Sequence, residues 1–129
     1  MTEGRRTASM YERLGGMAFF ESLTQRFYEG VATDALLRPL YPADLEPPRR
    51  HLCLFLAQFW GGPRLYDEER GHPRLRARHL PFKIGIKERD QWVHCMMRAM
   101  HELALDANLQ QRLAESFMGT ADWMRNTQG

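Results

Sequence analysis

Residues 17–31 read MAFFESLTQRFYEGV, and this stretch decides that the chain is built from helices. Phe20, Leu23, Phe27 and Val31 recur at intervals of three and four residues. That spacing places the four side chains in one apolar stripe along an α-helix. The stretch therefore predicts a helix that begins at Met17, ends near residue 30 and buries this stripe.

The same spacing predicts three further helices. Their inward residues are, in chain order, Leu52, Phe55, Leu56 and Phe59; Trp92, Met96, Met100 and Leu103; and Leu109, Leu113, Phe117, Thr120 and Met124. The period-two alternation that is typical of β-strands is absent from the sequence. The prediction is an all-α protein with four main helices and a long connection from residue 64 to about residue 87. Structureless connections of that length are uncommon and usually serve a ligand.

Turn and cap signals delimit these elements. Gly15-Gly16 ends a short apolar piece, and Pro47-Pro48 suits the first turn of a helix, where a missing amide hydrogen costs little. Gly61-Gly62-Pro63 ends that helix, and Asp106 is a plausible cap for the last one.

Length and composition limit the classes of protein to consider. A chain of 129 residues with 43% hydrophobic and 26% charged residues forms one domain, here residues 10–129 after a disordered tail at 1–9. A net charge of +2 gives no general affinity for nucleic acid. No apolar run is long enough for a signal peptide or a membrane span, so a cytoplasmic protein with free thiols at Cys53 and Cys95 is expected.

A second stretch, GHPRLRARHLPF at residues 71–82, carries the candidate for metal ligation. It is rich in arginine and places His79 two residues before a proline. A neutral imidazole is a good ligand for iron, zinc or copper. A single histidine is more often a surface or core residue, so His79 alone does not establish a site.

Other motifs point away from common functions. The stretch from His101 to Leu105 begins like the motif of a zinc protease helix, but Leu105 stands where the second histidine must be. The phosphate-binding glycine motifs and the serine hydrolase motif are absent. A surplus of aromatic residues remains on the predicted helices. Those residues are either ordinary core or the walls of an apolar slot, and haem would fit such a slot.

Six short motifs together resemble the truncated haemoglobins of the second group. They span nearly the whole chain and are Tyr11–Gly16 (YERLGG), Arg26–Tyr28 (RFY), Leu40–Pro42 (LYP), Phe55–Pro63 (FLAQFWGGP), Arg70–Phe82 (RGHPRLRARHLPF) and Glu88–Trp92 (ERDQW). The resemblance implies a two-over-two helical sandwich, the truncated globin fold, with haem b (iron protoporphyrin IX) held by His79.

The resemblance also implies roles for other residues of the pocket. Distal hydrogen bonding falls to Tyr28, Tyr41 and Trp92, and apolar contacts to Leu52, Phe55 and Phe82. Arg76 and Arg78 are candidates for pairing with the haem propionates. The usual gate histidine has no counterpart, because its position falls near Pro48. His51 is expected to point away, as the neighbour of the inward Leu52.

The expected function is binding of dioxygen and other small ligands, among them carbon monoxide. Two hydrogen-bond donors would slow ligand release, which favours scavenging, sensing or redox chemistry on peroxide, nitric oxide or sulfide over oxygen transport. Modest peroxidase activity, an electron donor and a homodimer are left open by the sequence. The alternative is a haem-free helical interaction or regulatory module with a basic surface stretch.

Overall fold

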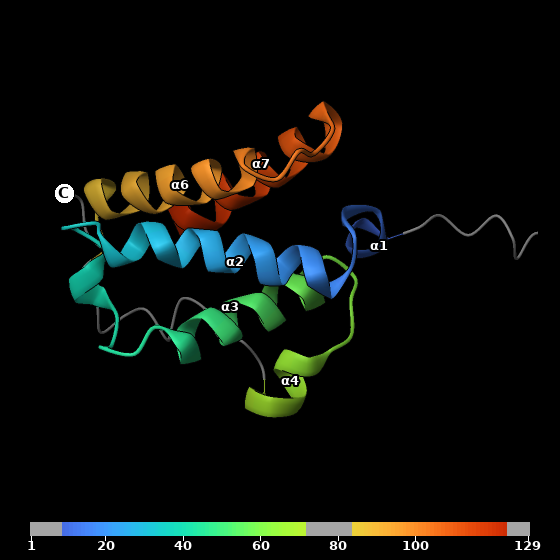
Figure 1. The fold of residues 1–129 in the computed structure, drawn as a ribbon, viewed down its shortest axis with the longest axis horizontal. Helices are drawn as coiled ribbons and strands as arrows, with labels where there is room; N and C mark the ends of the chain where they lie inside the picture. Colours follow the sequence, from blue (N-terminus) through green and yellow to red (C-terminus); the bar gives the residue numbers. More distant parts are fainter. Residues whose placement is uncertain (1–8, 72–83, 124–129) are drawn as a thin grey trace, which may run out of the picture.

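The computed structural model describes residues 9–71 and 84–123, and every regular element in those ranges is helical. The elements are α1 (Met10–Leu14), α2 (Met17–Ala32), the 3₁₀ turn η2 (Arg38–Leu40), α3 (Glu46–Phe59), α4 (Leu65–Arg70), α6 (Ile86–His101) and α7 (Ala107–Trp123) (Figure 1). No strand occurs among the described residues, which confirms the predicted all-α class. None of the helices in these ranges is long and apolar enough to cross a membrane.

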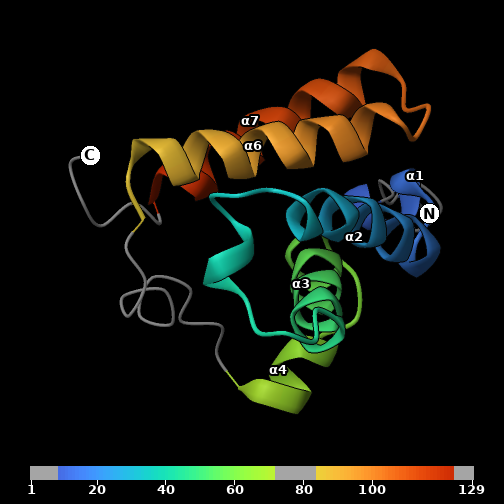
Figure 2. The ribbon, with the colours of Figure 1, turned by 60° about the vertical axis from the view of Figure 1, so that its left-hand side comes forward.

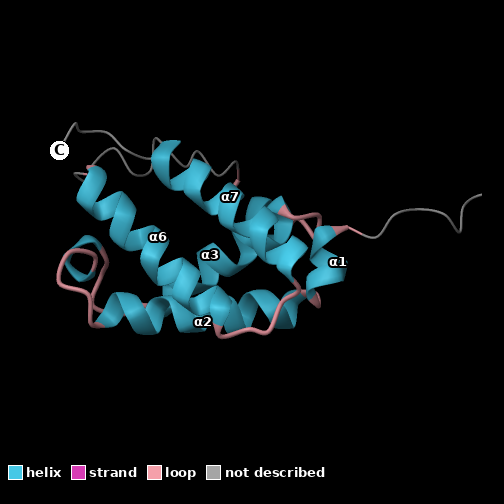
Figure 3. Ribbon diagram, turned by 90° about the horizontal axis from the view of Figure 1, so that it is seen from above, coloured by secondary structure: helices cyan, strands magenta, loops and turns pink. Residues whose placement is uncertain are grey.

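The four long helices form two pairs. Helix α2 packs against α3 on one side and against α6 on the other, and α6 lies alongside α7 (Figure 2). Helices α6 and α7 lie above α2 and α3 in the view of Figure 2, and Figure 3 shows helices joined by loops among the described residues. This arrangement confirms the predicted two-over-two truncated globin fold.

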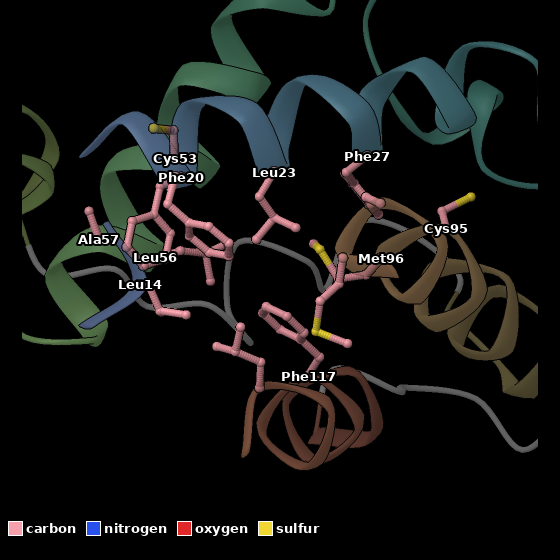
Figure 4. Packing of buried hydrophobic residues seen from close by; sticks show 14 of the residues in the cluster. Leu14, Phe20, Leu23, Phe27, Cys53, Leu56, Ala57, Cys95, Met96 and Phe117 are labelled. Atoms are coloured by element: carbon pink, nitrogen blue, oxygen red, sulfur yellow. The ribbon is translucent and has the colours of Figure 1, made fainter. Parts of the chain in front are cut away.

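The core lies between the two pairs. The stripe of α2 is fully buried, because Phe20, Leu23, Phe27 and Val31 all have no exposed surface. In Figure 4 the side chains of α2 point towards those of α6 and α7, with Phe117 of α7 on the opposite side. The helical spacing therefore identified the inward face of α2 correctly.

Helices α2 and α6 approach each other closely at Gly30. A Cβ at this position would lie 2.8 Å from Arg98 Nη2 and 3.3 Å from Cys95 Sγ. Cys95 and Cys53 are both buried free thiols, as the sequence predicted. Burial raises the pKa of the Cys53 thiol to about 11, so this thiol stays protonated at neutral pH.

The start of the described chain is fastened to the end of α3. Ser9 accepts a hydrogen bond from the backbone amide of Glu12, and the Glu12 carboxylate accepts one from Ser9 in return. The Tyr11 amide then donates to the carbonyl of Trp60 at 2.9 Å. Of the predicted tail, residues 1–8 lie outside the described residues, whereas Ser9 caps α1.

Two expectations need correction. The connection after α3 is not structureless, because α4 forms within it and α6 already begins at Ile86. The inward stripe of α3 is also misassigned in part, since Phe59 is 56% exposed and Leu52 and Phe55 are only half-buried. The residues of α3 that pack in the core are Cys53, Leu56 and Ala57.

Gly62 provides a test of the close contact between α1 and the end of α3. A Cβ there would lie 2.6 Å from the Tyr11 ring and 2.8 Å from the Ala57 carbonyl oxygen. We expect Gly62→Ala to lower the free energy of unfolding by about 1–3 kcal/mol, because the ring and the backbone must both move. Chemical denaturation measures this change.

Gly119 supplies the matched control for that substitution. It lies within α7, and a Cβ there would meet nothing within 4 Å. Gly119→Ala should raise the free energy of unfolding by roughly 0.5–1 kcal/mol, because alanine favours the helix. Equal effects of the two substitutions would show that the contact at Gly62 is not tight.

Candidate ligand-binding cavity

A cavity of about 350 Å³ opens between α3 and the α6–α7 pair. Its walls come from every long helix and are mainly apolar. The residues that line it are Tyr28, Leu37, Leu40, Tyr41, Pro42, Pro48, His51, Leu52, Phe55, Leu56, Phe59, Tyr66, Arg70, Ile84, Glu88, Arg89, Trp92, Ser116, Phe117, Thr120 and Ala121. A volume of this order is typical of small-molecule and cofactor sites.

The cavity brings together five of the residues that the sequence singled out. Tyr28, Tyr41 and Trp92, the three with polar tips, line it together with the apolar Leu52 and Phe55. Three segments far apart in the sequence supply the polar tips: α2, the segment after η2, and α6. The remaining candidates, His79, Arg76, Arg78 and Phe82, lie outside the described residues.

The polar aromatic residues form one cluster around Phe27. The Tyr28 and Tyr41 rings meet edge to face, with centroids 5.4 Å apart. Phe27 lies 4.9 Å from the Tyr28 ring and 5.3 Å from the Trp92 ring. Trp92 is held from the other side by Phe117 of α7, at 6.1 Å. Phe27 is fully buried, so the cluster rests directly on the core.

Burial keeps both tyrosines of the cluster protonated. Desolvation raises the pKa of Tyr28 far above its ordinary value, and the neighbouring Tyr41 raises it further. Desolvation also raises the pKa of Tyr41, to about 12, although hydrogen bonding from Tyr28 and Trp92 partly offsets the effect. Both residues therefore lie next to the Tyr41 hydroxyl group, and the Trp92 N–H can only donate to it. The protonated Tyr41 hydroxyl group can donate a hydrogen bond as well as accept one.

Sequence reasoning missed several polar residues of the wall, among them His51 and Arg70. His51 was expected to point away, but it lines the cavity and contacts Arg70 of α4, whose Nη1 lies 2.9 Å from His51 Nε2. A signal was available, because His51 stands four residues before Phe55 and such pairs share a helix face. Arg70 lies in a helix that the sequence pattern did not reveal, and its guanidinium also lies 5.9 Å from the centre of the Tyr66 ring.

Comparison with known proteins identifies the fold that surrounds this cavity. Residues 9–126 match the family described as bacterial-like globins. The chain belongs to the bacterial-like globin family. The resemblance to truncated haemoglobins of the second group is thereby confirmed.

Individual relatives show which kind of globin this chain resembles. It is 43% identical over 116 residues to the group 2 truncated haemoglobin YjbI of Bacillus subtilis, covering 90% of this chain and 87% of that one. It resembles the solved group II truncated haemoglobin of Bacillus anthracis with a TM-score of 0.93 and 39% identity, over 96% and 95% of the two chains. A truncated oxygen-avid haemoglobin from Bacillus subtilis matches with a TM-score of 0.88 and 42% identity, over 92% and 100%.

Family membership assigns a general chemistry to the cavity. Globins are haem proteins that bind oxygen and other small gaseous ligands, and this chain is one of them. The cavity found among the described residues suits such a cofactor. It is apolar over most of its wall and polar where Tyr28, Tyr41 and Trp92 meet.

The raised tyrosine pKa values of this globin give a prediction for alkaline solution. An ordinary tyrosine titrates near pH 10, about 2 units below Tyr41. A group whose pKa is higher in the folded protein than in the unfolded chain stabilises the fold at pH values below the pKa that it has in the unfolded chain. That contribution disappears as pH rises through the folded pKa, so the free energy of unfolding should fall between about pH 10 and pH 12.

Tyr41→Phe should remove part of this fall, because phenylalanine cannot ionise. Urea denaturation between pH 8 and pH 12 measures the slope, and the tyrosinate absorbance reports ionisation in the same samples. A variant with the wild-type slope, and with no tyrosinate signal lost above pH 11, would contradict the raised pKa of Tyr41.

Proposed function

We propose that this globin binds haem b and retains dioxygen through hydrogen bonds from Tyr41 and Trp92. The observation that supports the proposal is the convergence of three polar aromatic side chains in a mainly apolar cavity. Apolar walls exclude water, and polar tips at one place act on a ligand from one side. The proposed role is ligand scavenging, sensing or redox chemistry.

The described wall fits haem in its chemistry. The aromatic residues Phe55, Tyr66 and Phe117 offer flat apolar surface, and Arg70 brings positive charge to the wall, whereas Arg89 is paired with Asp90 and Asp122. Haem, when bound, supplies an iron atom that binds dioxygen and other small gases. In the proposed site the protein's own part is to hold the cofactor, exclude water and direct donors at the ligand.

His79 is the proposed ligand of the haem iron. It lies outside the described residues, so the support comes from the sequence and from the chain that borders it. Arg70 and Ile84, on either side of residues 72–83, both line the cavity. Ile84 is only five positions beyond His79 in the sequence, which limits the distance between their Cα atoms to about 17 Å. Arg76 and Arg78 remain candidates for the propionates.

In the proposed site, a bound ligand competes with the Tyr41 oxygen for the hydrogen-bond donors. The Tyr28 and Trp92 side chains both lie next to the Tyr41 hydroxyl group, which the Trp92 N–H can use as an acceptor. An oxygen atom that carries partial negative charge accepts hydrogen bonds more strongly than a phenol oxygen does. Dioxygen in the cavity would therefore attract both the Trp92 N–H and the Tyr41 O–H. Each such bond is worth about 1.5–3 kcal/mol in a dry site.

Two bonds of that strength make release slow, which is why retention is proposed instead of oxygen delivery. The similarity to a Bacillus subtilis haemoglobin that is itself described as oxygen-avid supports the same direction. Slow release suits a protein that scavenges or senses its ligand, or that carries out redox chemistry on peroxide, nitric oxide or sulfide. A haem-free interaction module is disfavoured, because Phe55, Phe59 and Trp92 line a cavity and do not close a core.

Visible absorption spectra test the cofactor and its ligand together. We expect purified protein to show a haem band that shifts on reduction and again under carbon monoxide. His79→Ala should lose stable haem on gel filtration, because the protein's bond to iron is removed. His101→Ala is the control, since His101 is exposed on α6 and should retain haem. Full haem occupancy in His79→Ala would refute the proposed ligand, and a colourless wild type that takes up no added haem would refute the function.

Trp92 gives the test of retention. Trp92→Phe removes one donor and keeps an aromatic ring against Phe27 and Phe117. We expect oxygen dissociation to become at least tenfold faster, since loss of about 1.4 kcal/mol or more corresponds to a factor of ten. Stopped-flow measurement of oxygen dissociation provides the rate. An unchanged rate would show that Trp92 does not hold the ligand.

A further inference from the structure

The segment that carries Tyr41 has little regular structure of its own. Tyr41 follows η2, and residues 41–45 connect that turn to α3 without a helix or a strand. The Tyr41 amide donates to the Arg38 carbonyl at 3.2 Å. Pro42, the next residue, has no N–H to donate. The position of the Tyr41 ring therefore depends on what holds the carbonyl groups of this segment.

A single side chain holds three of those carbonyls in succession. Arg38 Nη1 donates to the carbonyl oxygens of Tyr41 at 3.3 Å and Pro42 at 3.0 Å, and Nη2 donates to that of Ala43 at 2.9 Å. The rigid, forked guanidinium group is suited to several acceptors at once, which a lysine ammonium is not. Arg38 thus closes the segment into a compact bend that has Tyr41 at its beginning.

The residues just before η2 are held to α6, the helix that carries Trp92. The Asp34 carboxylate accepts hydrogen bonds from the amides of Leu36 and Leu37, both at 2.9 Å, and from Gln91 Nε2 at 2.6 Å. Gln91 immediately precedes Trp92 on α6. Burial opposes ionisation of Asp34, but these hydrogen bonds outweigh it and hold the pKa of Asp34 below its usual range.

The hydrogen bonds of Arg38 and those of Asp34 together fix the position of Tyr41 relative to Trp92. Leu37, which lies between Asp34 and Arg38 in the sequence, is only 1% exposed and packs in the core. Asp34 sets the distance of the segment from α6, and Arg38 sets the bend that turns the Tyr41 ring onto Tyr28. We propose that Arg38, which does not line the cavity, is a positioning residue that acts through Tyr41 to set the rate of ligand release. The inference rests on the proposed function of Tyr41 as a donor.

The test compares Arg38→Met with wild type in the haem-loaded protein. Methionine keeps an unbranched stem and removes all three donated hydrogen bonds. We expect oxygen dissociation to become about three- to thirtyfold faster, with the effect of Tyr41→Phe as the upper limit. The C–O stretching frequency of the carbon monoxide complex should rise towards that of Tyr41→Phe, because a donor near the ligand oxygen lowers this frequency.

The double variant distinguishes positioning from general loosening. Arg38→Met should add little to either measurement in the Tyr41→Phe background, because the group through which it acts is gone. An equal effect of Arg38→Met in both backgrounds would overturn the proposal. So would an Arg38→Met protein whose dissociation rate and stretching frequency match wild type.

Two further variants serve as controls for this test. Arg26→Met makes the same chemical change at an exposed ion pair with Glu102, and it should leave both measurements unchanged. Arg38→Lys keeps the charge but reaches fewer carbonyls, so its values should fall between those of wild type and Tyr41→Phe. If Arg38→Met does not fold, an Arg38→Lys protein identical to wild type overturns the proposal. A wild type without a haem band would refute the proposed function instead, and this inference with it.

Discussion

Close packing of α2 against both α3 and α6 is the constraint on which the rest of the structure depends. Helix α2 buries Phe20, Leu23 and Phe27 completely, and Gly30 lets α6 come near enough for the Phe27 and Trp92 rings to meet. Tyr28 follows Phe27 and is turned about 100° around the helix, which brings it to the edge of this core. The same packing that stabilises the fold thus sets the polar cluster at the cavity.

The cavity exists because α3 has two different faces. Cys53 and Ala57 lie four residues apart and pack in the core, where their small side chains allow a close approach to α2, while Leu56 borders both the core and the cavity. The neighbouring face carries His51 and Phe55, which line the cavity. A helix with bulky residues on the core side would stand further from α2. The division of side-chain size between the two faces therefore both closes the core and leaves room beside it.

Helical periodicity predicted the elements well where burial alone decides the pattern. The stripe of α2 and the cap at Asp106, which accepts from the Leu109 amide at 3.0 Å, agree with the structure. On α3 the pattern was less informative, because apolar residues occur both on a face that packs in the core and on a face that lines an apolar cavity. Phe59 was therefore predicted to be buried in the core. Helix α4 was missed because its six residues, LYDEER, are too short and polar to show a period.

The candidate site was predictable only in part, for a related reason. Tyr28, Tyr41 and Trp92 were found through a resemblance that spans the chain, whereas the contacts that position Tyr41 leave no periodic trace. Arg38 binds carbonyl oxygens, which every residue possesses, so its partners cannot be read from side-chain types. His51 was misplaced because a single neighbour, Leu52, was taken to define the inward direction, whereas the wall spans a wider arc of α3.

Burial gives the polar cluster its proposed chemistry as well as its place. A tyrosine can donate a hydrogen bond only while it keeps its proton, and desolvation raises the pKa of both Tyr28 and Tyr41. An ionised tyrosine would only accept and would repel a ligand that carries negative charge. Carbon monoxide acquires less charge than dioxygen and gains less from the same donors. In the proposed function, a neutral cluster of donors would therefore favour dioxygen over carbon monoxide through hydrogen bonding.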